Sequence, residues 1–262
     1  MAKQTEQTYQ TIQVERQGPV FTIQLNKPPL NIMDAAMIEE VLMALQETEA
    51  DAEVRIIVFR SAGEKAFCAG VSVKDHTPDL IRDMIPRFDD IFRQLARTDK
   101  VTLAVAQGFS LGGGFELVLM CDLVVAAENA QFGQPEIKLG QLPPVGIVLL
   151  PHLIGYSKAA ELLFTGKNIT AREAEALGLV NRVAPAGQLS QCAEELVKEM
   201  LTLSGSALRL NKNLLRRVSG LDFERVLQES EEFFLETVVP THDAQEGIFA
   251  FMEKRVPQWT HR

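Results

Sequence analysis

The chain has 262 residues, 46% of them hydrophobic, which suits one globular domain with a layer of helices and excludes a low-complexity or fibrous chain. The formal net charge of −9 argues against a partner bound through nucleic-acid phosphates. Cys68, Cys121 and Cys192 are odd in number and widely spaced, which favours free thiols in a reducing cytoplasm over disulfides or a metal site.

The N-terminal part of the chain predicts a hairpin followed by a helix. Residues 1–11 (MAKQTEQTYQT) are polar and lack the apolar core of a signal peptide, which predicts a cytoplasmic protein. Thr11–Val14 and Val20–Leu25 alternate apolar and polar residues, as the two strands of a hairpin do. After the proline-containing segment Asn26–Asn31, Asp34 is a good N-cap for a helix whose apolar residues recur at helical spacing.

The next segments predict βαβ units around a mostly parallel sheet. Arg55–Arg60 is a short apolar strand of the kind buried in parallel sheets. Ser61–Asp75 is predicted to be a loop, Asp79–Arg97 has helical periodicity, and Val101–Ala106 is the next strand. This alternation predicts the α/β fold class.

The stretch Gln107–Glu136 concentrates the features that indicate chemistry. Three consecutive glycines, Gly112-Gly113-Gly114, lead directly into a short apolar helix, Phe115–Met120, which carries a single carboxylate at Glu116. A buried acid in apolar surroundings is costly unless it has a partner or a function. A further strand is predicted over Asp122–Ala127.

Beyond Gly140 the sequence predicts helices almost throughout. The helical segments are Ser157–Thr165, Thr170–Leu177, Gln188–Leu203, Ser206–Arg216, Asp222–Val238 and His242–Lys254. Val145–Ile154 is apolar but far too short to cross a bilayer, and only Leu179–Val183 is predicted to be extended. These patterns predict a core over residues 1–200 and a helical oligomerisation region over 201–262, which covers a neighbouring subunit.

Two glycine-containing turns, Ala69-Gly70-Val71 and Gly112-Gly113-Gly114, follow two of the predicted strands. Neighbouring parallel strands end at the same edge of a sheet, so both turns can aim N–H groups at one carbonyl oxygen. Two such donors are the usual device for stabilising an oxyanion. Helix entry and packing explain these glycines equally well, and the spacing alone leaves both explanations open.

Glu116 and Glu136 lie 20 residues apart, so no single helix face carries both. They meet only if the turns that hold them adjoin in space. Two carboxyls together can hold a water molecule and move a proton, provided that burial or mutual repulsion raises the pKa of at least one of them. The alternative is that each is an ordinary acid favoured by a helix N-terminus.

Other candidate residues carry weaker signals. His76, His152 and His242 have no metal-ligand spacing and are predicted to lie at the surface or behind the site. Cys68 lacks the histidine arrangement of a thiol nucleophile, and Ser110 lacks the context of an esterase elbow. The sequence therefore predicts neither a metal site nor a covalent nucleophile.

Taken together, the motifs resemble the crotonase (enoyl-coenzyme A hydratase/isomerase) superfamily from about Val14 to Arg255. The matching segments are Asn26–Asn31, Lys65–Val71, Gly108–Asp122, Ala130–Gly140, Leu163–Gly166, Ala174–Val180 and Asp243–Arg255. The resemblance implies an α/β spiral of ββα units with a C-terminal helical trimerisation region. It also implies a homo-oligomer, a trimer or a hexamer built as a dimer of trimers.

The resemblance also implies roles for individual residues. The N–H groups of Val71 and Gly113 would form the oxyanion hole, and Glu116 and Glu136 would be the acid/base pair of a hydratase. Isomerases, dehalogenases and thioester hydrolases on this fold usually lack one or both acids, so the pair favours water addition. Residues expected to bind coenzyme A or substrate are Pro29, Leu30, Ala69, Gly70, Gly112 and Pro144. No metal or separate cofactor is implied, because coenzyme A is part of the substrate.

The chain departs from simple enoyl hydratases in two places. It has Pro143–Ile147 where they tend to have Gly-Ala-Gly-Gly, and Ser72 where they commonly have Asp. A closer resemblance, in Asn31–Ile38, Ser72–Asp79 and Thr241–Ala244, is to the cyclohexa-1,5-diene-1-carbonyl-CoA hydratases of anaerobic benzoyl-CoA degradation. The implied reaction is 1,4-addition of water that gives 6-hydroxycyclohex-1-ene-1-carbonyl-CoA.

Two other functions are open. One is a general hydratase for short-chain or branched enoyl-CoA, which differs in substrate range alone. The other is a non-catalytic family member that binds acyl-CoA or RNA; the intact glutamate pair and the acidic balance count against it. The expected partners are an acyl-CoA substrate and further copies of the chain, with no nucleic acid and no membrane.

Overall fold

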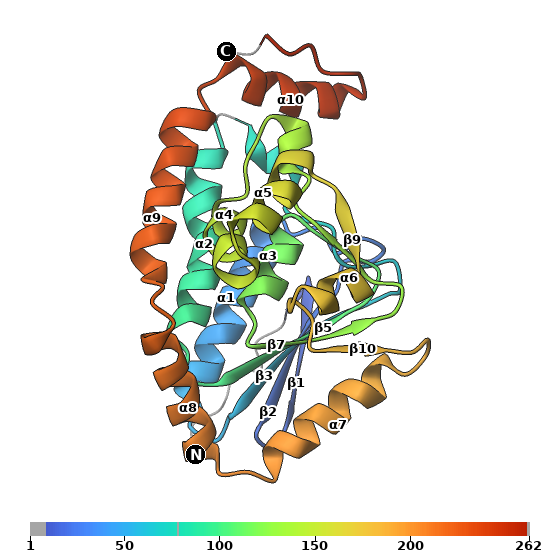
Figure 1. Cartoon of the computed structure of the whole chain (residues 1–262), viewed down its shortest axis with the longest axis vertical. Coiled ribbons are helices and arrows are strands. Elements are labelled where there is room, and N and C mark those ends of the chain that lie inside the picture. Colours follow the sequence, from blue (N-terminus) through green and yellow to red (C-terminus); the bar gives the residue numbers. More distant parts are fainter. Residues whose placement is uncertain (1–8, 78, 261–262) are drawn as a thin grey trace.

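The computed structural model describes residues 9–77 and 79–260 (Figure 1). Residues 1–8 of the polar N-terminal segment, and Pro78 within the segment Ser72–Asp79, lie outside the described residues. The described chain forms two sheets, with helices packed around them.

The larger sheet has six strands in the order β1-β2-β3-β5-β7-β10. Its strands are β1 (Ile12–Gln17), β2 (Val20–Leu25), β3 (Ile56–Ser61), β5 (Val101–Ala106), β7 (Leu123–Ala127) and β10 (Arg182–Ala184). β1 and β2 form the predicted antiparallel hairpin, and every other neighbouring pair in this sheet is parallel. β3 is apolar on both faces because both are buried: Ile57 and Phe59 join the main core, and Ile56 and Val58 join a second apolar cluster.

The smaller sheet consists of four three-residue strands in the order β4-β6-β8-β9. They are β4 (Ala66–Cys68), β6 (Phe109–Leu111), β8 (Gln131–Gly133) and β9 (Asn168–Thr170). β4, β6 and β8 run parallel, whereas β9 pairs antiparallel with β8. The turns that follow β4, β6 and β8 therefore come together at one edge of this sheet.

The chain repeats one structural unit as it builds the two sheets. In each repeat one strand joins the larger sheet, the next joins the smaller sheet, and a helical segment follows. The repeats are β3–β4 with α2 (Ile81–Arg97), β5–β6 with α3 (Gly113–Met120), and β7–β8 with the short 3-10 helix η2 (Glu136–Leu139). This arrangement confirms the predicted spiral of ββα units.

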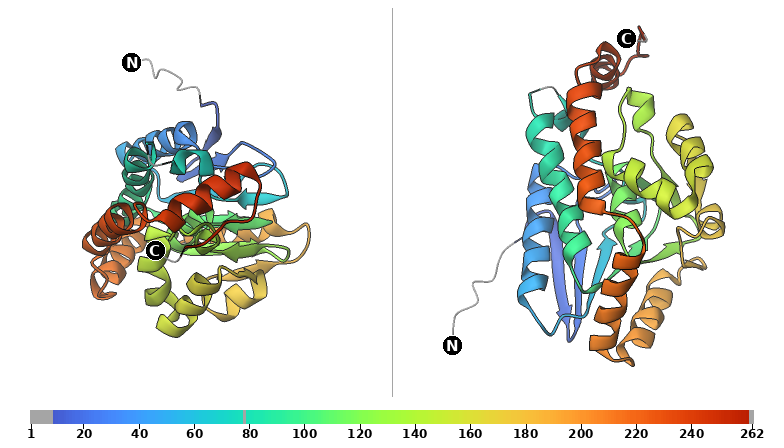
Figure 2. Two further views of the ribbon diagram at one scale, coloured as in Figure 1. Left: turned by 90° about the horizontal axis from the view of Figure 1, so that it is seen from above. Right: turned by 60° about the vertical axis from the view of Figure 1, so that its left-hand side comes forward.

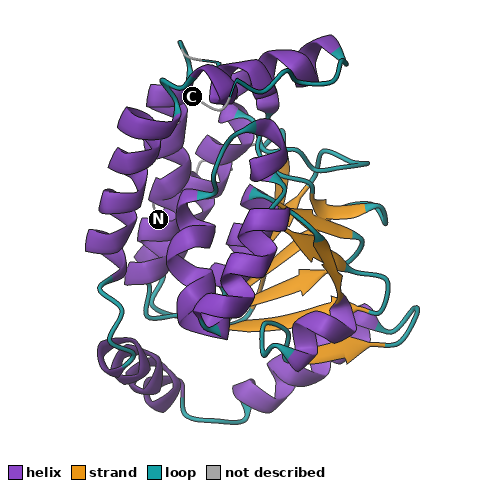
Figure 3. Cartoon of the chain, turned by 45° about the horizontal axis from the view of Figure 1, so that its top comes forward, coloured by secondary structure: helices purple, strands orange, loops and turns teal. Residues whose placement is uncertain are grey.

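Helices pack on both faces of the larger sheet and continue into the C-terminal region (Figure 3). The remaining helices are α1 (Ala35–Ala50), η1 (Val73–His76), α4 (Pro144–Ile154), α5 (Tyr156–Thr165), α6 (Ala171–Ala176), α7 (Leu189–Leu201), α8 (Gly205–Val218), α9 (Phe223–Phe233) and α10 (His242–Glu253). Asp34 caps α1 as predicted, since its side chain accepts a hydrogen bond from the N–H of Met37 at 3.1 Å. A π-helical turn, Phe234–Val238, follows α9.

The last three helices dock on different parts of the core (Figure 2). α8 is fixed by the buried Lys212, which donates a hydrogen bond to Asp122 at 2.6 Å. α9 packs beside α2 and α4. α10 lies across the top of the molecule in Figure 1 and packs on η2, where a Cβ on Gly247 would be 2.0 Å from the carbonyl oxygen of Leu139.

Several short elements differ from the sequence-based prediction. The predicted loop Ser61–Asp75 contains β4 and η1, and β6, β8 and β9 were not predicted at all. The apolar run Val145–Ile154 belongs to helix α4, which begins at Pro144 because proline is favoured in the first helical turn. Three-residue strands are too short to show an alternating pattern, and α4 is apolar on almost every face, so neither carries a periodic signal.

Candidate active site

A cavity of about 100 Å³ opens where the turns after β4, β6 and β8 meet helices α2, α3 and α4. Its wall is mostly apolar. Polar side chains on it are Glu116, Glu136, His76 and Gln141. A small, mainly apolar space with few convergent polar groups is the usual form of a site for a small molecule.

The two predicted oxyanion-hole residues adjoin each other on this cavity. A Cβ on Gly113 would lie 2.8 Å from Cγ2 of Val71. The N–H of Gly113 is the first amide of α3 and has no partner within the helix. The carbonyl of Gly70 accepts a hydrogen bond from the N–H of Met33, and the N–H of Ser72 donates to the carbonyl of Met33. Neither of these bonds uses the N–H of Val71, which lies between Gly70 and Ser72. Both residues line the cavity, and the oxyanion hole formed by their N–H groups stays a prediction.

Gly112 has to be glycine for two reasons. Its φ is +53°, a conformation that disfavours any side chain, and a Cβ there would lie 2.7 Å from Oε1 of Glu136. The backbone therefore approaches this carboxyl more closely than any other residue type allows. The glycines of this turn serve close approach as well as helix entry.

Glu116 lies in the first turn of α3 and is 2% exposed. The N–H of Gly146, in the first turn of α4, donates a hydrogen bond to its Oε1 at 2.8 Å. Burial raises the pKa of Glu116 to about 7, although the hydrogen bond from Gly146 favours the charged form. At neutral pH the carboxyl of Glu116 therefore populates both its protonated and its ionised form.

Glu136 begins η2, with two residues between it and the end of β8, and lines the same cavity. Burial, followed by the negative charge of Glu116, holds the pKa of Glu136 well above its ordinary value. With its NH₂ group toward Glu136, the side-chain amide of Gln134 donates to Oε1 and Oε2 at 3.1 and 3.2 Å. Two such acids cannot both ionise easily, so the pair holds one proton and one charge around neutral pH.

The other candidate residues divide into those on the cavity and those beside it. Ala69, Gly70 and Pro144 line the cavity. Leu30 lies beside the loop after β4, since its carbonyl accepts a hydrogen bond from the N–H of Ala69 at 2.9 Å. Pro29 precedes Leu30 in this segment, and neither of these two is among the residues that form the cavity wall.

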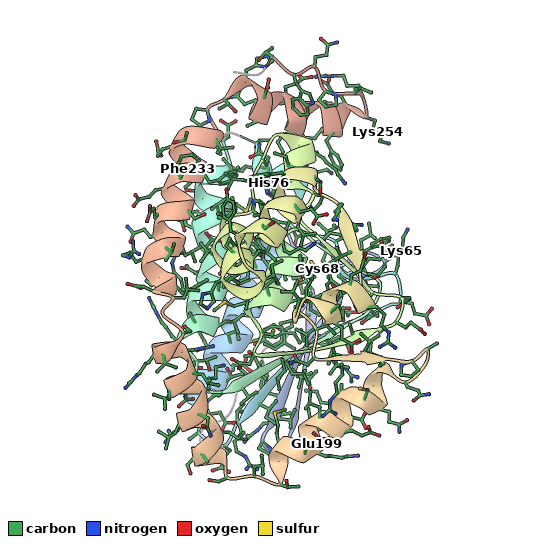
Figure 4. All side chains as sticks on the ribbon, in the orientation of Figure 1. Lys65, Cys68, His76, Glu199, Phe233 and Lys254 are labelled. Atoms are coloured by element: carbon green, nitrogen blue, oxygen red, sulfur yellow. The ribbon has the colours of Figure 1, made fainter. Side chains whose placement is uncertain are left out.

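His76 was expected at the surface or behind the site, but it lies on the cavity wall. Its Nδ1–H donates to the carbonyl of Ser72 at 2.9 Å, which directs Nε2 away from that bond as an acceptor. Burial lowers the pKa of His76, so the ring is neutral at physiological pH. Figure 4 labels His76 below α10 and Cys68 nearer the centre of the molecule.

Cys68 does not have the properties of a nucleophile. Its side chain is fully buried, and burial raises the pKa of the thiol to about 12. A thiol with that pKa is protonated at neutral pH and unreactive. The absence of a nucleophilic role, predicted from the sequence context, is consistent with this environment.

A model of the enoyl-CoA hydratase/isomerase family matches residues 15–262 of the chain. The chain belongs to this family. It is 40% identical over 261 residues to a probable enoyl-CoA hydratase, echA8, of Mycobacterium tuberculosis, an alignment that covers 97% of this chain and 100% of the relative. The predicted superfamily and the predicted enzyme class, a hydro-lyase, are confirmed.

Two further relatives are informative about the acyl group. The chain is 34% identical over 252 residues to cyclohexa-1,5-dienecarbonyl-CoA hydratase of Thauera aromatica, with 95% of this chain and 96% of the relative covered. The crystal structure of carnitinyl-CoA hydratase from Mycobacterium avium superposes with a TM-score of 0.85 at 32% identity, over 97% of this chain and 100% of that chain. Family members with different acyl groups therefore resemble this chain to a similar degree.

Three residues around the glutamates were missed by the sequence analysis. Gly146 donates to Glu116, Gln134 faces Glu136, and Gln141 lines the cavity with its Nε2 bonded to the carbonyl of Ala244. Gln134 lies two residues before Glu136, so sequence proximity was the one available signal. Gly146 and Gln141 reach the site only through the placement of α4 and α10.

Within residues 9–77 and 79–260, no helix has the length and apolarity needed to span a membrane. Over the same residues, no group of three or more His, Cys, Asp and Glu side chains is placed to hold a metal ion.

Proposed function

We propose that this enzyme adds water to a conjugated acyl-CoA thioester, with cyclohexa-1,5-diene-1-carbonyl-CoA as its substrate. The observation that supports hydration most directly is the pairing of Glu116 and Glu136 on one small cavity, with the pKa of both raised by burial. Two carboxyls that share a proton at neutral pH can act as base and acid in one catalytic step.

In the proposed reaction, the thioester oxygen accepts hydrogen bonds from the N–H groups of Val71 and Gly113. The amide of Gly113 is at the positive end of α3, which favours the negative charge that develops on this oxygen. These donors are fixed by the backbone before substrate binds, so little reorganisation is needed in the transition state.

Proton transfer then uses the two glutamates in opposite states. The ionised Glu116 takes a proton from water while the water oxygen bonds to the β carbon, and the electrons move toward the thioester oxygen as a dienolate. The protonated Glu136 gives its proton to the remote ring carbon, which leaves one ring double bond and yields 6-hydroxycyclohex-1-ene-1-carbonyl-CoA. Gly146 supports this order because its N–H stabilises the charged form of Glu116.

The cavity wall supports a compact acyl group. Pro143 and Pro144 line it together with Phe88 and Phe234, which gives a rigid and largely apolar surface. A volume of about 100 Å³ is of the same order as the ~150 Å³ protein cavity that admits benzene. A six-membered ring fits this scale better than a long acyl chain does.

The test is hydration of cyclohexa-1,5-diene-1-carbonyl-CoA and crotonyl-CoA by the purified protein, followed by chromatography and mass spectrometry. Fast hydration of the cyclic diene with slow turnover of crotonyl-CoA is the expected result. The reverse preference would establish a general short-chain or branched enoyl-CoA hydratase, in line with the relative from Mycobacterium tuberculosis. Turnover of neither would favour a binding protein without catalytic activity.

We also infer that the enzyme assembles into trimers or hexamers through residues 201–262. Exposed apolar side chains cluster on α8: Leu210, Leu214, Leu215 and Val218. Large exposed apolar patches mark protein interfaces more often than free surface. Sedimentation velocity should show a mass of three or six chains, and a monomer at micromolar concentration would contradict this assignment.

A further inference from the structure

A third buried carboxyl, that of Asp89, lies near the two glutamates and has no role in the mechanism above. Asp89 is on the inner face of α2 and is 0% exposed. Among the described residues, neither of its carboxyl oxygens accepts a hydrogen bond from an N–H or O–H donor. An ionised carboxylate in that position would be strongly unfavourable. A buried polar group without donors requires an explanation.

The polar partner available to Asp89 is another acid, Glu231 of α9. Two carboxyl groups form a hydrogen bond only when one of them is protonated. Glu231 already accepts a hydrogen bond from the guanidinium of Arg93 at 2.6 Å, and this ion pair is only 13–15% exposed. Because Glu231 already accepts the bond from Arg93, a hydrogen bond between the two acids places the proton on Asp89.

Asp89 is also close enough to the catalytic cavity to affect Glu116. The neighbouring residue, Phe88, lines the cavity, and its ring would be 2.7 Å from a Cβ on Gly113. α2 packs on α3, the helix that carries Glu116, and the negative charge of Glu116 acts directly on Asp89. The carboxyls of Glu136, Glu116, Asp89 and Glu231, here called the carboxyl cluster, therefore extend from the cavity to α9.

Several charged groups on α2 and on the elements packed against it have partners other than Asp89; Glu224 of α9, for example, pairs with Arg93 and Arg97. Glu39 of α1 pairs with Arg87 on the exposed side of α2. Asp75 and His76 of η1 lie at the N-terminal end of α2, and His76 is neutral. The groups that act on Asp89 are Glu116, Glu231 and Arg93.

We propose that Asp89 is a positioning residue that stays protonated by sharing its proton with Glu231, so that the negative charge needed for catalysis can reside on Glu116. This inference rests on the proposed role of Glu116 as the base. If Asp89 lost its proton, its charge would oppose ionisation of Glu116, and water activation would require a higher pH. Burial, then the charges of Glu116 and Glu231, raise the pKa of Asp89 well above its ordinary value, which agrees with a protonated group.

The first test is Glu231→Gln. This change removes one of the negative charges that raise the pKa of Asp89, while Arg93, still paired with Asp90 and Glu224, continues to favour the ionised form. The pKa of Asp89 should therefore fall toward the range in which Glu116 titrates, and the acid limb of the kcat/KM–pH profile should move to higher pH by about 0.5 to 1.5 units. Glu232→Gln, an exposed neighbour on α9, is the matched control and should leave the profile unchanged.

The second test is reversal of that shift by Asp89→Asn. The amide mimics the protonated acid in shape and donates a hydrogen bond, so Asp89→Asn alone should keep the acid limb within about 0.3 units of wild type. In the double variant, Asp89→Asn with Glu231→Gln, the shift should disappear because no third charge can form. A shift that persists in the double variant, or no shift in Glu231→Gln, would overturn the proposal.

The third test needs no substrate and therefore separates this inference from the proposed function. Infrared spectroscopy of the free protein at neutral pH should show a protonated-carboxyl band that is absent in Asp89→Asn. An unchanged spectrum in Asp89→Asn would show that Asp89 is ionised and would refute the inference, whatever the enzyme hydrates. Loss of activity toward all acyl-CoA substrates with the band still present would refute only the proposed function.

Discussion

Carboxyl groups in two regions of the chain have opposite environments. The carboxyl of Asp122 accepts hydrogen bonds from the N–H and hydroxyl of Thr102, at 2.7 and 2.8 Å, and from Lys212 at 2.6 Å, with Arg216 3.8 Å away. In the carboxyl cluster, by contrast, Glu116 receives one backbone donor and Asp89 none from N–H or O–H groups of the described residues.

The difference follows from the purpose of each region. A carboxylate that accepts several hydrogen bonds holds elements together, here β5, the residue before β7, and α8. A carboxyl that is buried without enough donors keeps a raised pKa and can exchange a proton near pH 7. Stability is sacrificed in the second region, because unpaired polar groups cost free energy in a protein interior.

The largest effect should come from removing either of the two acids proposed to be catalytic. Glu116→Gln or Glu136→Gln keeps the shape of the side chain but cannot exchange a proton, and hydration should fall by roughly 10²–10⁴-fold in kcat/KM. Steady-state hydration of the preferred acyl-CoA measures this loss. Glu128→Gln, an exposed glutamate after β7, is the control and should retain full activity.

Breaking the paired region should affect folding rather than catalysis. Lys212→Met removes the nearest cation of Asp122 and the hydrogen bonds that the buried ammonium donates, and it should lower the free energy of unfolding by about 2 to 3 kcal/mol, with kcat of the folded enzyme unchanged. Urea unfolding gives the first quantity. Arg209→Met, an exposed substitution on the same helix, should change stability far less. Equal destabilisation by both variants would contradict a specific role for Lys212.

The two regions should also differ in their dependence on pH. The pKa of Glu116 is about 7 in the folded protein against 4.5 as its ordinary value, so the folded state binds this proton more tightly than the unfolded state. Its contribution to stability is complete below pH 4.5 and is lost as the pH rises toward 7. Glu116→Gln cannot ionise and should therefore exceed wild type in stability at alkaline pH, by about 2 kcal/mol. Equal unfolding free energies at alkaline pH would show that Glu116 ionises in the folded state without penalty.

A smaller change in stability, with the opposite dependence on pH, is expected for substitution of Glu40, whose pKa is lowered rather than raised. Burial alone would raise its pKa, but hydrogen bonds from Thr11, Gln10 and Ile12 outweigh burial and lower it. Glu40→Gln should cost about 1 kcal/mol at neutral pH, because bonds to a charged acceptor become bonds to a neutral one. Since the folded pKa is depressed, this difference should vanish as the pH falls through it. The exposed substitution Glu49→Gln should show neither effect.

The parts of the fold that were predictable are those with a long enough periodic pattern. β1, β2, β3, β5 and β7, and helices α1 and α2, match the predicted segments to within a few residues. The strands of the smaller sheet have three residues each, and such segments carry no measurable alternation. Their pairing depends on contacts between distant parts of the chain, which local patterns do not encode.

The candidate site was predictable to the extent that its chemistry lies next to unusual local sequence. The three glycines Gly112-Gly113-Gly114 and the single acid Glu116 are unusual in local sequence and can be identified without a structure. The other glycine-containing turn, Ala69-Gly70-Val71, identifies Val71. The donor Gly146 is 30 residues from Glu116 and becomes a partner only when α4 begins at Pro144. Asp89 is one acid among several on α2, and only the packed structure shows that it faces inward.

The packing of α10 on η2 has a consequence for the order in which the enzyme becomes functional. The segment that carries Glu136 is held from outside by residues near the C-terminus, where Gln141 bonds to Ala244 and Gly247 contacts Leu139. During synthesis the N-terminal parts of a chain fold first. The sheets and Glu116 can therefore form on the ribosome, but Glu136 acquires its final support only after α10 has emerged. A nascent chain that has not yet formed α10 would lack this support for the segment that carries Glu136.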